Sequence, residues 1–161
     1  MQNKERGGGW LQPGWALAGF VALGLAVGAV DGVVTAASVG RWYTTLRHPP
    51  GTPPDAVFGP VWTILYVVMG AAAWRVWRVA GWRAVRLWFW QMAVNAAWSP
   101  VFFGWHAPRS ALVVLAALCV LVAATARRFA SADRVAGGLM LPYLAWCLYA
   151  LYLNAGIVWL N

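Results

Sequence analysis

The sequence contains very little charge. Only 12 basic and 4 acidic residues occur among 161, whereas 62% of the residues are hydrophobic. Soluble domains carry about 25% charged residues, so this composition excludes an ordinary soluble protein. The mean hydropathy of +0.63 agrees with that conclusion. Much of the chain is therefore expected to face lipid rather than water.

Cysteine is scarce, and groupings of residues that carry out catalysis or bind metals are missing. Cys119 and Cys147 both stand in apolar stretches, where small buried side chains are favoured over a disulfide or metal ligands. His48 and His106 have no acid or cysteine spaced to complete a metal site, so ordinary exposed histidines are expected. No nucleophile–base–acid set is visible. We predict no metal site and no required cofactor.

Long apolar runs, in contrast, are plentiful. Five stretches approach the ~20 residues that a membrane-spanning helix needs: Leu11–Val30, Phe58–Trp74, Leu87–Trp105, Ser110–Ala126 and Val135–Asn161. A membrane barrel would instead alternate over segments of about ten residues. The sequence predicts an all-α membrane protein, a five transmembrane helix bundle, with a flexible tail at residues 1–9 and one domain over residues 10–161. The first run exceeds the ~7–15 apolar residues of a signal peptide, so it is interpreted as a retained helix.

The basic residues divide unequally between the two sides of such a bundle. Three lie in the first and third connections, and nine lie on the other side: Lys4, Arg6, Arg75, Arg78, Arg83, Arg86, Arg127, Arg128 and Arg134. Positive residues accumulate on the cytoplasmic side of membrane proteins. We predict a multi-pass cell-membrane protein whose N-terminus is cytoplasmic and whose C-terminus and first loop lie outside. The net charge of +8 fits anionic lipid headgroups better than nucleic acid.

The first connection, residues 40–57, is the strongest indication of function. Its four prolines, at 49, 50, 53 and 54, fix the backbone and remove amide donors, so the segment forms neither a helix nor a central strand. Aromatic residues stand on both sides, including Tyr43 before the prolines and Trp62 after them. This stiff, aromatic-framed segment predicts a lid over a ligand pocket.

Three of the predicted helices carry aromatic and polar side chains on a single face. The residues, spaced three or four apart, are Trp62 and Tyr66, then Gln91, Asn95, Trp98, Ser99 and Phe102, then Pro142, Trp146, Ala150 and Asn154. The small Ala150 leaves room for a flat ring system against Trp146. Each stripe alone is more often protein core, and Asn95 suits an interhelical hydrogen bond as well as a ligand contact. Their position below the lid favours a binding site.

The first predicted helix leaves two questions open. Asp31 is an acid within an apolar stretch, about 24 Å along the helix from Trp15, which favours the outer membrane interface over a functional role. Gly24, Gly28 and Gly32 form a smooth stripe at four-residue spacing. Such a stripe favours packing within the chain over a dimer seam.

Several segments resemble the TspO/translocator-protein family, also called tryptophan-rich sensory proteins. They are W-Y-T-T-L-R-H-P at 42–49, P-P-D-A-V-F-G-P-V-W-T-I-L-Y at 53–66, Q-M-A-V-N-A-A-W-S-P-V-F-F-G-W-H at 91–106, P-Y-L-A-W at 142–146 and L-N at 153–154, and the 13 tryptophans fit the name. The resemblance implies a five-helix membrane protein, usually a homodimer. It also implies that porphyrins such as protoporphyrin IX, and isoquinoline carboxamide or benzodiazepine ligands, bind beneath the first loop.

Carried over to this sequence, the resemblance implies a pocket wall made of Tyr43, Pro53, Trp62, Tyr66, Asn95, Trp98, Trp146 and Ala150. Some family members degrade protoporphyrin in light, and the tryptophans implicated there match Trp62 and Trp146, which would then be catalytic. The leading expectation is porphyrin binding for sensing or transport. The alternatives are a porphyrin-degrading enzyme that depends on light or oxygen, and a structural membrane partner with a vestigial pocket.

The sequence departs from the family pattern at three places. The family usually has a basic residue where His48 stands and an aromatic residue where Gly51 stands, so lid rigidity and any anchoring of an acid differ here. No Lys or Arg follows Tyr152 to complete the cholesterol motif of animal relatives. Cholesterol transport is therefore not expected.

Overall fold

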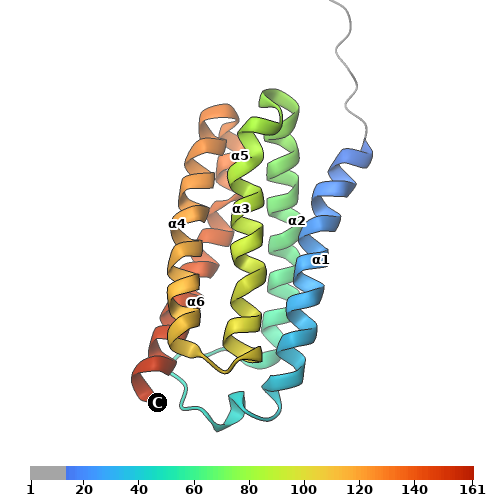
Figure 1. The fold of residues 1–161 in the computed structure, drawn as a ribbon. Coiled ribbons are helices and arrows are strands. Elements are labelled where there is room, and N and C mark those ends of the chain that lie inside the picture. Colours follow the sequence, from blue (N-terminus) through green and yellow to red (C-terminus); the bar gives the residue numbers. More distant parts are fainter. Residues whose placement is uncertain (1–13) are drawn as a thin grey trace, which may run out of the picture.

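The structure is a computed structural model that describes residues 14–161, and all its regular elements are helices. Its long helices run side by side (Figure 1): α1 (Gly14–Val39), α2 (Asp55–Ala80), α3 (Trp82–Ser99), α4 (Pro108–Ala132) and α6 (Leu141–Leu160). The short elements are η1 (Tyr43–Thr45), η2 (Pro100–Gly104) and α5 (Arg134–Leu139). The all-α prediction is confirmed. The predicted tail at residues 1–9 lies outside the described residues.

Four segments of residues 14–161 are long and apolar enough to cross a membrane, namely α1, α2, α4 and the α5–α6 segment Arg134–Leu160. Helix α3 is not among them. Arg83 and Arg86 in its first turns, with Gln91 and Asn95 further along, make it less apolar than the others. It nevertheless lies within the bundle, packed against α4 and α2.

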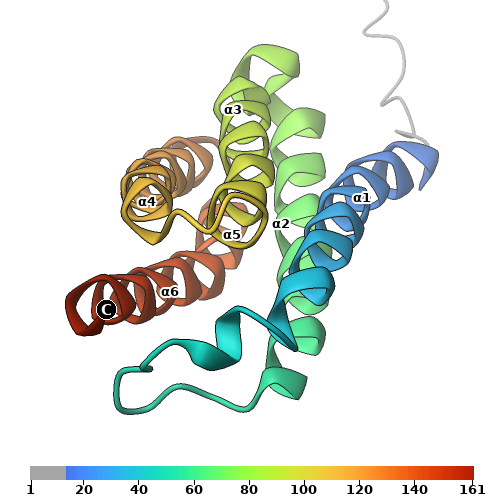
Figure 2. The same cartoon turned by 60° about the horizontal axis from the view of Figure 1, so that its bottom comes forward.

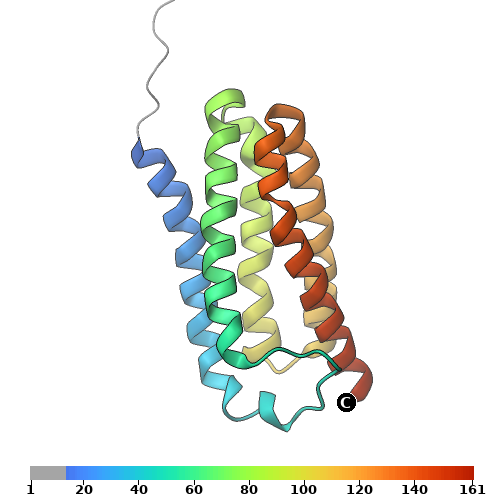
Figure 3. The ribbon, with the colours of Figure 1, turned by 180° about the vertical axis from the view of Figure 1, so that it is seen from behind.

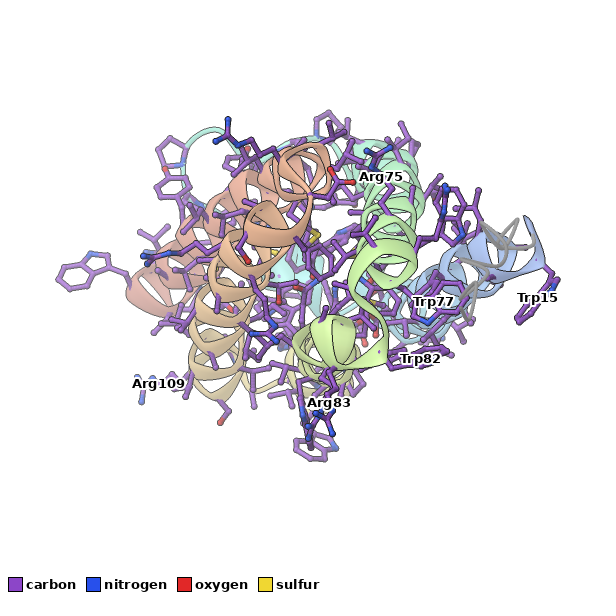
Figure 4. All side chains as sticks on the ribbon, turned by 90° about the horizontal axis from the view of Figure 1, so that it is seen from above. Trp15, Arg75, Trp77, Trp82, Arg83 and Arg109 are labelled. Carbon is purple, nitrogen blue, oxygen red and sulfur yellow. The ribbon has the colours of Figure 1, made fainter. Side chains whose placement is uncertain are left out.

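Helices α2 and α3 form an antiparallel pair joined by a single residue. Gly81 has a φ of 71°, in the region that favours glycine, and α3 begins directly after it. At the same end, the Asp133 side chain accepts hydrogen bonds from two backbone amides of α5 and pairs with Arg75 of α2 at 2.8 Å. Figure 4 looks onto this end, where Arg83 points away from the bundle. The α2–α3 and α4–α5 connections are thus one residue each, Gly81 and Asp133, and the Arg75–Asp133 pair links the second connection to α2.

The glycine stripe of α1 packs within the chain. A Cβ at Gly28 would collide with the ring of Tyr66, and one at Gly24 would lie 3.1 Å from the carbonyl oxygen of that tyrosine. Gly70 of α2 approaches the backbone of α1 equally closely. The predicted packing is therefore confirmed for two glycines, whereas Gly32 has open space before it.

Residues 40–54, called the lid below, connect α1 to α2 and run extended after η1. Figures 2 and 3 show the lid passing beneath the bundle from the end of α1 to the C-terminal end of α6, then back to α2. The proline segment contains neither helix nor strand, as predicted. The only helical part is the single turn η1.

The lid is fastened to α6. The hydroxyl of Tyr152 donates to the carbonyl oxygen of Pro50 at 2.9 Å, and that of Tyr149 donates to the carbonyl oxygen of Gly51. Pro49 packs so closely on Gly156 that a Cβ there would lie 2.6 Å from the proline ring.

The backbone of Arg47 extends this contact to the end of α6. Its amide donates to Oδ1 of Asn161 at 3.0 Å, and its carbonyl oxygen accepts from Nδ2 of the same side chain at 3.1 Å. The lid is therefore bound to the C-terminal end of α6 as well as joined to α1 and α2.

Candidate functional site

A cavity of about 460 Å³ lies between α1, α2, α3 with η2, and α6, and the lid contributes Tyr43 to its wall. This volume is within the roughly 300–1,000 Å³ of small-molecule pockets. Helix α4 contributes no lining residue, because it packs behind α3 and α6.

Seven of the eight predicted pocket residues line this one cavity: Tyr43, Trp62, Tyr66, Asn95, Trp98, Trp146 and Ala150. Pro53 belongs to the lid but is not among the lining residues. Ser99, Phe102 and Asn154 from the predicted faces also line the cavity, whereas Gln91 and Pro142 do not. Gln91 instead lies buried beside Met69. The spacing of four residues therefore identified the helix faces that line the cavity. It did not show that Gln91 and Pro142, at the ends of two of these faces, lie beyond the cavity.

The cavity has an aromatic wall made by α2 and α6. The rings of Trp62 and Tyr66 stack with centroids 5.7 Å apart. Trp62 meets Trp146 edge to face, at 6.3 Å and 88°, and Phe58 meets Trp146 in the same way at 6.0 Å. On the α3 side, Trp98 lies close to Asn154 and donates its indole hydrogen to the amide oxygen at 3.3 Å. Such a wall suits a flat, apolar ligand.

A chain of hydrogen bonds leads from the cavity wall into the core. The hydroxyl of Tyr66 lies 3.1 Å from Oδ1 of Asn95 and 3.4 Å from Oδ2 of Asp31. Asn95 in turn donates from Nδ2 to the hydroxyl of the fully buried Tyr143. Asn95 therefore holds helices together and also faces the cavity, so both interpretations of this amide apply.

Asp31 is a wall residue that the sequence did not assign to the site. It lines the cavity together with Gly28, Gly32 and Thr35 of α1. These residues follow the spacing of three and four that was recognised only for the glycines. Extending that stripe through Asp31 and Thr35 identifies the missed face.

Tyr43 is the lid residue that lines the cavity. Burial, and secondly the negative charge of Asp55, raise the pKa of Tyr43 to about 12, so its hydroxyl stays protonated at neutral pH. The ring of His48 packs on Tyr43 at 4.5 Å, and its Nε2 lies 3.2 Å from the carbonyl oxygen of Tyr43. His48 was predicted to be exposed, but this packing leaves it half-buried. His106 is exposed as predicted.

The cavity is lined by acidic side chains but not by basic ones. Asp31 and Asp55 line it, and no Lys, Arg or His does so among residues 14–161. Within the same residues, no group of three or more His, Cys, Asp or Glu side chains could hold a metal ion. The wall therefore offers stacking surfaces and hydrogen-bonding groups, with acidic rather than basic side chains.

Comparison with known proteins agrees with this arrangement. The TspO/MBR family model matches residues 20–160. The chain belongs to the TspO/MBR family. It is 38% identical to the tryptophan-rich protein TspO of Chlorobaculum tepidum, over 90% of this chain and 95% of the relative. It is 34% identical to the translocator protein of Bos taurus, over 89% of each chain. It is also 37% identical to protein CrtK of Rhodobacter capsulatus, over 77% of this chain and 81% of that protein. Membership makes the chain a membrane protein of the sensory and translocator group.

Proposed function

We propose that this membrane protein binds porphyrins or related flat, hydrophobic ligands in the cavity beneath the lid, for tetrapyrrole sensing or transport. The observation that supports the proposal best is the aromatic wall, where Trp62, Trp146 and Trp98 border one cavity. Ala150 and Trp146 of α6 both line the cavity, and Tyr43 of the lid contributes to its wall. The tetrapyrrole class itself comes from the family resemblance of the sequence motifs.

A titration of the purified protein with protoporphyrin IX in the dark, followed by absorbance, tests this proposal. Ala150→Leu should fill the space beside Trp146 and weaken binding more than it lowers the melting temperature. Ala116→Leu on the exposed face of α4 is the matched control and should leave binding unchanged. If the wild-type protein changes the porphyrin spectrum no more than protein-free micelles do, the binding function is wrong and the vestigial-pocket alternative holds.

The second candidate is a light-driven breakdown of the bound porphyrin. It is favoured by the contact between Trp62 and Trp146, which places two indoles in one cavity wall. An excited porphyrin would accept an electron from an indole, with dioxygen as the final oxidant. Phenylalanine keeps the stacking but is a much poorer electron donor.

Variants separate this enzymatic function from binding alone. Trp62→Phe and Trp146→Phe should lower dark affinity by no more than about 1.5 kcal/mol per aromatic contact. Breakdown under light should fall far more in these variants than in Trp90→Phe, an exposed control outside the cavity. Equal breakdown in wild-type protein, the double variant and protein-free micelles would leave binding as the only function.

We further propose five membrane spans, with α3 and η2 together forming the fifth. Their 18 and 5 residues extend roughly 35 Å at about 1.5 Å per residue, longer than the ~30 Å hydrocarbon core. Counting basic residues places the N-terminus in the cytoplasm, and the lid and C-terminus outside. The protein is then a multi-pass protein of the cell membrane.

Cysteine labelling of intact cells tests this topology. Cys119 and Cys147 are both buried, so new cysteines can be distinguished from them. An impermeant reagent should label Thr52→Cys in the lid and spare Arg83→Cys. The opposite result would invert the topology.

The family resemblance also leads us to propose a homodimer. Light scattering of the purified protein with detergent mass subtracted should give twice the 17.5 kDa of one chain. A mass of one chain across the concentrations used would contradict the proposal.

A further inference from the structure

The carboxylate of Asp31 has few hydrogen-bond partners for a group in the wall of a cavity between apolar helices. An ionised carboxylate accepts up to four hydrogen bonds. Among residues 14–161, Oδ1 of Asp31 is buried without a partner, and Oδ2 has only the hydroxyl of Tyr66, at a long 3.4 Å. That hydroxyl is closer to Oδ1 of Asn95, at 3.1 Å, and it has one proton to donate.

The other donors around Asp31 are already engaged. The hydroxyl of Ser99 donates to the backbone carbonyl oxygen of Asp31 at 3.1 Å and also lies 2.9 Å from the hydroxyl of Thr35. The amide nitrogen of Asn95 donates to Tyr143. No Lys, Arg or His among residues 14–161 lines the cavity, and the other acidic side chain there is Asp55 at the start of α2.

We infer that Asp31 is a recognition subsite for a nitrogen that carries hydrogen, best a protonated amine, on the flat hydrophobic ligand of this cavity. Such a group supplies the donor that the surrounding helices withhold. A charge-assisted hydrogen bond away from bulk water is stronger than a neutral one. The inference rests on the proposed binding function and specifies which ligands the cavity prefers.

The same carboxylate should weaken the binding of ligands that carry an acidic group. A ligand carboxylate inside the cavity would meet Asp31 and Asp55 and, among residues 14–161, no positive side chain. Either the ligand or a wall carboxylate would then have to keep a proton, which disfavours binding of the ionised acid. A porphyrin diacid therefore binds best with its carboxylates outside the cavity, whereas its pyrrole N–H groups suit the wall. Neutral or amine-bearing flat ligands avoid this restriction.

Two matched ligand pairs test the inference by titration in detergent micelles. The pair 1-pyrenemethylamine and 1-pyrenemethanol differs by an ammonium in place of a hydroxyl, and protoporphyrin IX is compared with its dimethyl ester. The wild-type protein should prefer the amine and the ester, the amine by about tenfold or more. Asp31→Asn, which keeps the size of the side chain, should reduce both preferences. Asp133→Asn, outside the cavity, is the control and should change neither.

Comparing each ratio between wild-type and variant protein cancels the partition of the ligands into micelles. Preferences that are the same in the wild-type protein and in Asp31→Asn would overturn the inference while leaving the binding function intact. If the wild-type protein binds none of the four ligands, the binding function itself fails. A folding defect of the variant would appear in its melting curve, and Asp31→Ser then replaces it in the same comparison.

Discussion

The attachment of the lid to α6 predicts how fast a ligand leaves. In the double variant Tyr149→Phe and Tyr152→Phe, the lid loses the two hydroxyls that bind its carbonyl oxygens at Gly51 and Pro50. Tyr152 is 49% exposed, so water competes for these bonds. We therefore assign each bond the lower part of the usual range, about 0.5–1 kcal/mol. Together they contribute about 1–2 kcal/mol, which raises the open-to-closed ratio of the lid roughly 5- to 30-fold.

Two assays measure this change. Dissociation of bound protoporphyrin, followed by stopped-flow fluorescence, should accelerate by the same factor if the lid must open first. Trypsin should also cleave faster after Arg47, because an open lid exposes that bond. Ser131→Ala deletes an exposed hydroxyl that bonds within α4, and it serves as the control. Unchanged dissociation and cleavage in the double Phe variant would refute the assignment of these bonds as the fastening of the lid.

Two further predictions concern stability. Gly28→Ala should push the ring of Tyr66 away from α1 and lower the melting temperature, whereas Gly14→Ala, which meets open space, should not; equal melting temperatures would contradict the packing. Although desolvation acts in the opposite direction, hydrogen bonds from backbone amides and the charge of Arg75 lower the pKa of Asp133. The stabilising contribution of this carboxylate is then present above its unfolded pKa of about 3.9 and is lost as pH falls through the lower folded pKa. The stability advantage of the wild-type protein over Asp133→Asn should hold at pH 7 and shrink below about pH 4; a difference independent of pH would be evidence against the pair.

Much of the site was predictable because helical periodicity fixes which side chains share a face. Trp62 and Tyr66 stack as their spacing requires, and Trp146 and Ala150 lie on one wall of one cavity. The prolines of the lid likewise exclude regular structure whatever surrounds them. These features depend on local geometry alone.

Other features depend on packing between segments that are distant in the sequence. The periodicity of a single helix gives no information about such packing. Asp31 reaches the cavity because close packing of Gly24 and Gly28 on Tyr66 sets the rotation of α1. Pro53 was predicted to line the cavity but does not, because the lid extends as far as α6 before returning to α2. The apolar run at Val135–Asn161 divides into α5 and α6 at Met140, which hydropathy alone does not reveal.

The attachment of the lid also sets the order in which the cavity is completed during synthesis. Tyr149 and Tyr152 bind lid residues that precede them by 98 and 102 positions, and Asn161 binds Arg47 across 114 positions. Chains are made from the N-terminus, so the lid emerges long before α6 exists to hold it. Until then Trp62 and Tyr66 lack the other half of the aromatic wall, which Trp146 of α6 supplies. A nascent chain stopped before α6 should therefore insert its earlier helices but retain no ligand, which makes ligand capture a late event in the biogenesis of this protein.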